Sequence, residues 1–381
     1  MGLAGILFAG AGAHAQDAVK IGLVLPLTGP FASIGRQVEA GATLYVKLKG
    51  DAVAGKIVQL IVKDDGGVAD ATKRIVQDLI VNEKVGVVAG FGLTPLALAS
   101  APLATQAKVP AVVMAAGTST ITEASPYIVR SSFTLPQATE PMADWALKNG
   151  LRNVVTLVSD YGPGIDAEKA FAGQFAKSGG RSEALRVPLA NPDFSPFLQR
   201  VADLKPDALF VFVPAGVGAQ FMKQFVERGL DRSGIRLIAT GDVTDDDLLN
   251  GMGDAALGIV TSHHYSADHD SPENAAFVEA FRRFNPGTRP NFMAVGGYDG
   301  MHAIYEGLKK TGGATGQALV DAMKGLSWTS PRGPVTIDAQ TRDIVQNIYV
   351  RKVERKGGEL YNVEFETIPN VKDPVKAAKT P

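Results

Sequence analysis

Cysteine is absent from the 381-residue chain, which excludes disulfides, cysteine-ligated zinc and thiol catalysis. An excess of charge is also absent, because 38 Lys and Arg stand against 39 Asp and Glu, for a formal net charge of -1. Nucleic-acid binding depends on clustered cations that neutralise phosphates, so no nucleic-acid partner is expected. Beyond the N-terminus no run of about 18 apolar residues occurs, and the mature protein is expected to be soluble.

Catalytic and cofactor motifs are missing as well. The chain has no Gly-x-Ser-x-Gly elbow, no P-loop, no His-Glu-x-x-His and no Gly-x-Gly-x-x-Gly after its first predicted strand. Asp245-Asp246-Asp247 lacks the alternating oxygen ligands of a calcium loop, and a first helical turn would explain these acids. His263 and His264 are adjacent on a predicted strand, so they should point to opposite faces and share no metal. We therefore expect no metal, no cofactor and no enzyme.

The N-terminus resembles a secretory signal peptide. Residues 1–12 form the apolar run MGLAGILFAGAG, and Ala13-His14-Ala15 has the small-x-small pattern that precedes signal-peptidase cleavage. Residues 1–15 are therefore predicted to be a signal peptide, with the mature chain beginning near Gln16 and reaching the periplasm. The usual basic residue before the apolar run is missing, and a poorly ordered tail is the alternative interpretation.

Short apolar runs alternate with longer amphipathic runs. Strands are predicted at Val19–Leu25, Ile57–Lys63, Val85–Gly90, Ala111–Ala115, Val154–Ser159, Leu185–Pro188, Ala208–Val213, Ile235–Ala239 and Gly258–Ser262. Helices are predicted at Ile34–Lys47, Asp70–Val81, Pro95–Gln106, Thr139–Lys148, Ala167–Lys177, Ser195–Leu204 and Val217–Arg228. This order predicts an α/β protein whose parallel sheets are covered on both faces, as in doubly wound folds.

The order of elements repeats, which predicts two similar lobes. A third region, with helices at Asn274–Phe284, Phe292–Lys309 and Ala318–Met323 and then three strands, can return to both lobes. Three interlobe crossings are expected, near Ser131–Pro141, His264–Asp270 and Pro334–Asp343. The predicted division is residues 16–135 plus 267–338 for lobe 1, 136–266 plus 339–368 for lobe 2, and 369–381 as a flexible tail.

Ligands of open α/β sheets bind at the carboxyl ends of the strands, where four segments stand out. Gly90–Pro95 and Ala115–Thr120 each offer glycine, hydroxyls and a helix start, and together they could form an anion site. Tyr161 follows the first strand of the second lobe and could close over a ligand. Asp242 follows another strand and could accept from an ammonium or hydroxyl group. Capped turns are the alternative for each segment.

The loop after the first strand identifies a family. Residues 19–46, VKIGLVLPLTGPFASIGRQVEAGATLYV, resemble the opening of type I periplasmic solute-binding proteins of ABC transporters, of the branched-chain amino-acid (Leu/Ile/Val)-binding-like type. The resemblance continues through LIVKDDGGVADATKRIVQDLI, PLATQAKVPAVVMAAGTST, SDYGPG and AVGGYDGMHAIYEGLKK, over almost the whole mature chain. It implies two lobes joined by three crossings, a ligand cleft between them, hinge closure and delivery to a membrane permease.

The resemblance also implies roles for single residues. In the family, the positions of Leu93-Thr94, Ala116 and Thr118 hold a ligand carboxylate, Tyr161 matches an aromatic residue and Asp242 an acid that binds an amino group. This sequence departs in having Ile34 where tyrosine is common, Pro214–Val217 where an aromatic residue is frequent, and Asp in place of Glu. The predicted ligand-binding residues are Phe31, Ile34, Leu93, Thr94, Ala115, Ala116, Thr118, Tyr161, Ala215, Gly216 and Asp242.

These departures favour a roomier, more apolar pocket, as in family members that bind benzoate-type acids. The prediction is therefore a monomeric importer component that captures an aromatic acid of the benzoate, hydroxybenzoate or cinnamate type. A branched-chain or other aliphatic amino acid is the alternative ligand. A ligand-sensing receptor domain and a doubly wound enzyme are the alternatives from other classes, but each would need segments or motifs that are not visible here.

Overall fold

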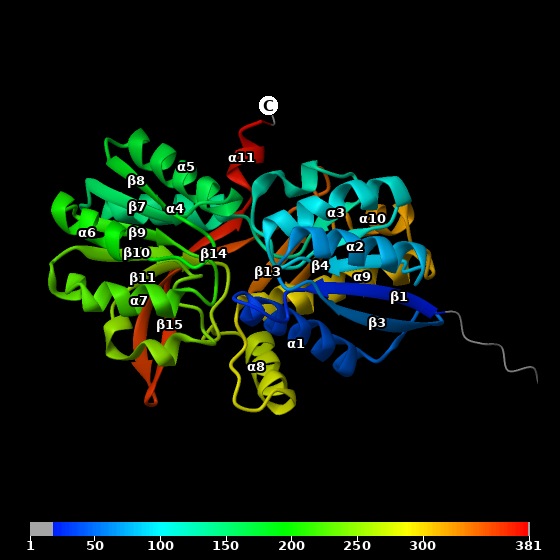
Figure 1. Cartoon of the computed structure of the whole chain (residues 1–381). Helices are drawn as coiled ribbons and strands as arrows, with labels where there is room; N and C mark the ends of the chain where they lie inside the picture. Colours follow the sequence, from blue (N-terminus) through cyan, green and yellow to red (C-terminus); the bar gives the residue numbers. More distant parts are fainter. Residues whose placement is uncertain (1–17, 380–381) are drawn as a thin grey trace, which may run out of the picture.

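The computed structural model describes residues 18–379, and Figure 1 shows two lobes, each built on a sheet with helices on its faces. The predicted signal peptide, residues 1–15, lies outside the described residues. None of the helices in residues 18–379 has both the length and the apolar character that a membrane crossing requires.

The first lobe contains a six-stranded sheet in the order β2-β3-β1-β4-β5-β6. Its strands are β1 (Ala18–Leu25), β2 (Ala52–Val53), β3 (Lys56–Asp64), β4 (Val87–Gly90), β5 (Ala111–Val113) and β6 (Ile128–Arg130). All neighbours are parallel except β2 and β3. The strands β4 and β5 are buried throughout, which is typical of a parallel sheet with helices on both faces.

Helices from two distant parts of the chain cover this sheet. They are α1 (Ala32–Lys49), α2 (Ala69–Val81), α3 (Thr94–Ala107) and η1 (Ser119–Glu123), followed much later by α8 (Pro272–Phe284), α9 (Phe292–Thr311) and α10 (Gln317–Met323). Helices α1 and α9 pack backbone to backbone, because a Cβ on Gly41 would lie 1.9 Å from the carbonyl oxygen of Ala294. Glycine is needed there for the late helices to join the first lobe.

The second lobe contains a nine-stranded sheet in the order β12-β13-β14-β11-β10-β9-β7-β8, with β15 paired to β14. Its parallel part is β7 (Asn153–Ser159), β8 (Arg181–Val187), β9 (Ala208–Phe212), β10 (Arg236–Thr240) and β11 (Val260–His263). Its antiparallel part is β12 (Ser327–Ser330), β13 (Gly333–Ile337), β14 (Ile344–Lys356) and β15 (Glu359–Val371). Its helices are α4 (Leu135–Lys148), α5 (Gly162–Lys177), α6 (Ser195–Leu204), α7 (Gly218–Glu227), η2 (Leu230–Arg232), η3 (Leu249–Ala256) and α11 (Pro374–Ala377).

The chain passes from one lobe to the other three times, at 131–134, at 264–271 and between α10 and β12 at 324–326, the last earlier than the expected Pro334–Asp343. The first passage is shorter than expected because Thr134 and Gln137 form a capping box that begins α4 at Leu135. The α/β class, the two lobes with parallel sheets and the three crossings are therefore confirmed.

The strands β12 and β13 connect both lobes. They belong to the segment expected for lobe 1, yet β13 is hydrogen-bonded to β14 of the second sheet. Trp328 of β12 nevertheless donates through Nε1 to Asp299 Oδ1 of α9, at 3.0 Å. The lobe boundaries 16–135 with 267–338 and 136–266 with 339–368 stay predictions.

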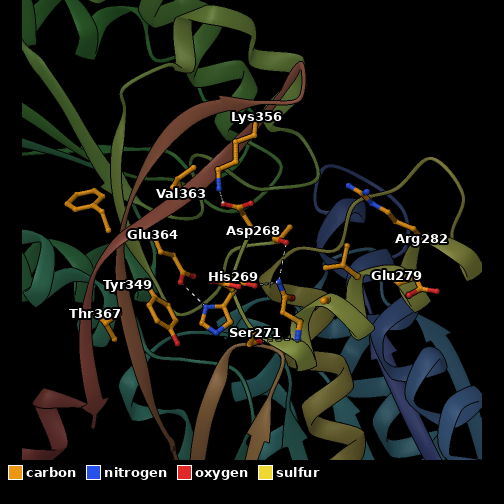
Figure 2. A pocket seen from close by; sticks show the side chains of 16 residues that line it. Asp268, His269, Ser271, Glu279, Arg282, Tyr349, Lys356, Val363, Glu364 and Thr367 are labelled. Atoms are coloured by element: carbon orange, nitrogen blue, oxygen red, sulfur yellow. Dashed lines mark hydrogen bonds and ion pairs between the residues drawn. The ribbon is translucent and has the colours of Figure 1, made fainter.

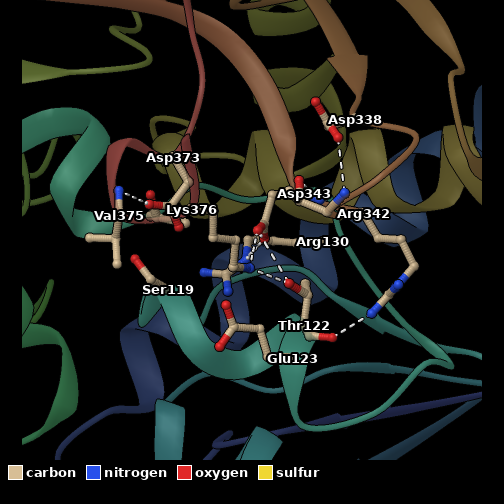
Figure 3. Close-up of polar contacts among 12 residues, drawn as sticks. Ser119, Thr122, Glu123, Arg130, Asp338, Arg342, Asp343, Asp373, Val375 and Lys376 are labelled. Atoms are coloured by element: carbon tan, nitrogen blue, oxygen red, sulfur yellow. Dashed lines mark hydrogen bonds and ion pairs between the residues drawn. The ribbon is translucent and has the colours of Figure 1, made fainter. Parts of the chain in front are cut away.

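The expectation of a flexible tail at 369–381 is wrong for the residues that the structure describes. The strand β15 continues to Val371, and α11 follows it. Lys376 is buried and pairs with Asp343, whose other oxygen lies 2.8 Å from Nε of Arg130 (Figure 3). The proline and lysine content indicated disorder, but pairing with β14 and a buried carboxylate partner order this segment.

The expectation that His263 and His264 point to opposite faces is also wrong. Their ring centroids lie only 4.4 Å apart. Strand β11 ends at His263, so His264 already belongs to the second crossing and strand alternation no longer applies.

Candidate functional site

The candidate site lies between the lobes, where strand ends of both sheets meet. It is lined by Ile34, Gly92, Leu93, Thr94, Ala115, Ala116, Gly117, Phe133, Leu135, Tyr161, Pro163, Phe212, Pro214, Ala215, Asp242 and Met293. The enclosed hollow measures about 20 Å³, close to the space that one water molecule needs. Most of the lining is apolar, and polar groups are confined to a few positions.

The wall from the first lobe carries two threonines side by side. Thr94 begins α3 and Thr118 precedes η1, and both are buried. Thr94 Oγ1 donates to Thr118 Oγ1 at 3.0 Å. Within residues 18–379 the backbone N–H groups of these two threonines donate to no protein acceptor. Hydroxyl and amide donors therefore converge at one end of the pocket.

Ala116 contributes less than expected. Its N–H donates to the carbonyl oxygen of Phe91 at 3.1 Å, so this amide is already used inside the first lobe. Its carbonyl oxygen accepts from Arg130 at 3.1 Å. The N–H of Ala116 is therefore not available to the expected ligand carboxylate, although the residue does line the pocket.

The wall from the second lobe is aromatic. The ring of Tyr161 stacks on that of Phe212, with centroids 6.1 Å apart and planes 18° apart. Burial raises the pKa of the Tyr161 hydroxyl well above its usual range, so this group stays neutral. The two rings give the pocket a flat apolar surface.

Asp242 is the acidic group of the pocket. It follows β10 and is buried, and its Oδ2 accepts from Thr240 Oγ1 at 2.9 Å. Burial raises the pKa of Asp242 to about 7, against the opposing effects of the Thr240 hydrogen bond and the Arg351 charge. Among the described residues no ion pair to Asp242 is formed, so its carboxyl remains available to a hydrogen-bond donor in the pocket.

Arg351 supports the Asp242 loop from behind. A Cβ on Gly241 would lie 2.1 Å from a terminal nitrogen of Arg351 and 2.6 Å from Cβ of His263. Only glycine leaves room for the guanidinium group there. The loop that carries Asp242 is thereby packed against a buried cation.

Eight of the predicted residues line the pocket, namely Ile34, Leu93, Thr94, Ala115, Ala116, Tyr161, Ala215 and Asp242. Thr118 lies one hydrogen bond away, through Thr94. Phe31 and Gly216 are not part of the lining. Phe31 packs near Gly67, and Gly216 faces Ser33 across the cleft.

Eight further lining residues were not among the predicted ligand-binding residues, although Gly92, Gly117 and Pro214 belong to loops that the sequence singled out. They are Gly92, Gly117, Phe133, Leu135, Pro163, Phe212, Pro214 and Met293. Phe212 ends β9 and is the last residue but one of the strand predicted at Ala208–Val213, which could have indicated its position. Phe133 and Met293 come from the first crossing and from the start of α9, and no local pattern relates them to the strand ends.

A larger groove, of about 1050 Å³, lies on the outside between the start of α8 and the β14–β15 hairpin. Two ion pairs occupy it, His269 with Glu364 at 2.7 Å and Lys356 with Asp268 at 2.5 Å. Dashed lines mark both pairs in Figure 2. The groove shares no lining residue with the pocket at the strand ends. We therefore place the candidate site in the smaller interlobe pocket.

Two lobes with a buried pocket between the strand ends define a two-lobed α/β binding protein. The family model for the periplasmic binding protein matches residues 18–359, and the chain belongs to this family.

Known relatives agree with this assignment. The chain is 62% identical to a solute-binding protein of an ABC transporter from Rhodopseudomonas palustris BisB5, solved with 3,4-dihydroxybenzoic acid, with a TM-score of 0.93 and coverage of 95% and 100% of the two chains. A second such protein, from R. palustris HaA2 with p-hydroxybenzoic acid, is 42% identical, with the same TM-score and coverage. The Leu/Ile/Val-binding protein homolog 6 of Brucella melitensis is 45% identical over 371 residues, which cover 96% of this chain and 95% of the relative.

Proposed function

We propose that this chain is the solute-binding component of an ABC importer and that its ligand is an aromatic carboxylic acid of the benzoate, hydroxybenzoate or cinnamate type. One observation carries the proposal. The pocket has hydroxyl and amide donors at Thr94, with Thr118 hydrogen-bonded directly behind it, stacked rings at Tyr161 and Phe212, and an acceptor at Asp242. A ring with a carboxylate and a polar substituent matches these features.

The carboxylate would meet the donors of the first lobe. The start of a helix favours an anion through its N–H groups and its dipole. Two hydroxyls can turn toward an oxygen anion, and hydrogen bonds to charged groups are stronger than neutral ones. In this arrangement Thr94 and Thr118 hold the carboxylate without a cation in the pocket lining.

The ring would lie against Tyr161 and Phe212 of the second lobe. Offset stacking suits a flat ligand more than a branched aliphatic one. Ile34 and Ala215, which stand where larger groups are frequent in the family, add apolar surface. Asp242 would accept from a hydroxyl on the ring.

Hinge motion would admit the ligand. The hollow of about 20 Å³ is far smaller than a benzoate ring, so the lobes must separate for binding and close again over the ligand. A closed complex would then be presented to the permease. We further propose a periplasmic location, reached through the signal peptide of residues 1–15, a monomeric state and the absence of catalysis.

The amino-acid alternative rests on the same acid. Asp242 could bind an ammonium group, as the family position implies, and relatives named as Leu/Ile/Val-binding homologues favour it. Burial raises the pKa of this carboxyl, so ionising it for an ammonium group costs free energy that a neutral hydroxyl donor does not require.

Calorimetry separates the two ligands. The purified mature protein is titrated with benzoate, 4-hydroxybenzoate, 3,4-dihydroxybenzoate, cinnamate, leucine and valine. We expect heat from the aromatic acids and none from the amino acids. Binding of leucine or valine alone would refute the aromatic proposal, and turnover of a bound acid would refute the absence of catalysis.

A further inference from the structure

Four rings form a cluster directly behind the pocket. Phe133, which lines the pocket, stacks on His264 with centroids 4.9 Å apart and planes 28° apart. The same ring meets His263 edge-on at 4.9 Å, and Phe292 meets His263 edge-on at 4.2 Å. Phe133 belongs to the first crossing, the histidines to the end of β11 and the second crossing, and Phe292 begins α9. The cluster therefore joins the pocket wall to the hinge.

The two imidazoles are polar groups in an apolar setting. Both residues are fully buried, and in the described part of the chain none of their four ring nitrogens has a hydrogen-bond partner. An unsatisfied buried polar group costs about 1–3 kcal/mol, and phenylalanine would fill the same space without that cost. Histidine as simple packing is thus unfavourable here.

The charged groups that face the cluster are cationic. Arg332 approaches from the turn before β13 and Arg351 from β14, and both are fully buried. Burial first, and then these guanidinium groups, hold the pKa of both imidazoles well below the usual range, and His263 adds to the effect on His264. The carboxylates that act on the two guanidinium groups are Asp299, which pairs with Arg332 at 2.8 Å, and Asp242, Asp245, Asp246 and Glu364 around Arg351.

We propose that His263 and His264 are positioning residues of the binding site, in which the neutral pair holds Phe133 as a wall of the pocket and a proton on either ring favours separated lobes. This inference rests on the proposed function, because it concerns the same pocket. Opening would let water reach the rings, and an imidazole with an ordinary pKa near 6.5 would then be charged in mild acid. Ligand is therefore held at neutral pH and released in acid.

Calorimetry with 4-hydroxybenzoate at pH 7.5 and pH 5.5 tests the inference. One histidine that is neutral when the lobes are closed and has a pKa of about 6.5 when they are open gives an affinity loss of about tenfold over this interval. We expect that loss in the wild type and a loss below about twofold in the double variant His263→Gln/His264→Gln. His302→Gln is the matched control, because His302 lies in α9 and packs on Trp328 of β12 instead of on the cluster. This variant should lose affinity between the two pH values to the same extent as the wild type.

The outcomes distinguish the inference from the proposed function. Equal wild-type affinity at both pH values, or an undiminished loss in the double variant, overturns the inference and leaves aromatic-acid binding intact. If none of the aromatic acids binds at either pH, the proposed function fails, and thermal denaturation of ligand-free protein then tests whether the two histidines stay neutral in the closed fold.

The direction in which thermal stability changes with pH follows from the protonation of the two rings. Both rings are neutral in the folded protein and charge on unfolding below about pH 6.5, so stability falls as the pH falls. The wild type should lose more melting temperature between pH 7.5 and 5.5 than the double variant, because this linkage requires imidazoles that stay neutral in the folded protein. The same pH slope in both proteins would overturn the inference. If the double variant does not fold, histidine ring resonances of the wild type decide, and two imidazoles that titrate near pH 6.5 in the folded protein overturn the inference.

Discussion

Gly162 of the second lobe lies against Thr118 of the first, so closely that a Cβ on Gly162 would stand 2.7 Å from the threonine hydroxyl oxygen. A second contact joins the same two segments, because Ser119 N–H donates to Asp166 Oδ2 at 3.0 Å. The start of α5 therefore meets the proposed carboxylate end of the pocket in the closed arrangement of the lobes.

Gly162→Ala should weaken ligand binding through this contact. An added methyl group in a packed interface costs about 1–3 kcal/mol, equivalent to roughly 5- to 150-fold in affinity. Gly173→Ala is the matched control, because it lies on the same helix and its Cβ would meet nothing within 4 Å. Calorimetry of both variants with the best aromatic acid measures the difference. Equal affinities would show that closure does not bring these residues into contact.

Thr118→Ala should also weaken binding, because it removes a hydroxyl from the anion end of the pocket. Loss of one partner of a buried charged group costs about 1–3 kcal/mol. Thr118→Ser keeps the hydroxyl and should stay within about threefold of the wild type. Unchanged affinity in the alanine variant would mean that the carboxylate binds elsewhere.

Asp242→Asn tests which ligand group binds to Asp242, a ring hydroxyl or an ammonium. An aromatic-acid binder should lose little, because the asparagine oxygen still accepts from a ring hydroxyl and no ammonium is involved. An amino-acid binder should lose most of its affinity, since the buried ammonium would face no carboxylate. Titration of the variant with 4-hydroxybenzoate and with leucine measures both. A large loss for 4-hydroxybenzoate would assign an ionic role to Asp242.

Lys376→Met should destabilise the fold by about 1–3 kcal/mol, because it removes a buried hydrogen-bonded partner of Asp343 while Arg130 remains. Lys379→Met is the matched control, since its ion pair with Glu123 is exposed and such pairs contribute little. Urea denaturation of both variants gives the free energies of unfolding. Equal values would mean that the buried Lys376–Asp343 pair adds nothing to the stability of the fold.

Elements built from apolar β-branched runs were predictable from the sequence. Strands β4, β9 and β10 are buried along most of their length, and continuous apolar runs mark such strands. The first half of β8 and the far end of β15 are largely exposed, so their residues gave no apolar signal. β12 was missed for the same reason, with Ser327 and Thr329 exposed on it.

The site was predictable where it follows a strand. Thr94, Tyr161 and Asp242 occur at strand ends, and the rule for open sheets places such residues together. Phe133 and Met293 depend on the path of the crossings, and no local spacing encodes that path. The partner of Asp245 was not predictable for the same reason. Asn291, whose Nδ2 donates to Asp245 Oδ1 at 2.8 Å, begins a helix of the other lobe.

The small size of the interlobe hollow affects the rate of ligand capture as well as the shape of the pocket. A molecule with its lobes in this closed arrangement has no room for a ring, so it cannot capture a ligand until the lobes separate. The observed dissociation constant is then the intrinsic one divided by the open fraction. Substitutions far from the pocket that favour opening would raise the number of productive encounters, yet they would also shorten the residence time on which delivery to a permease depends.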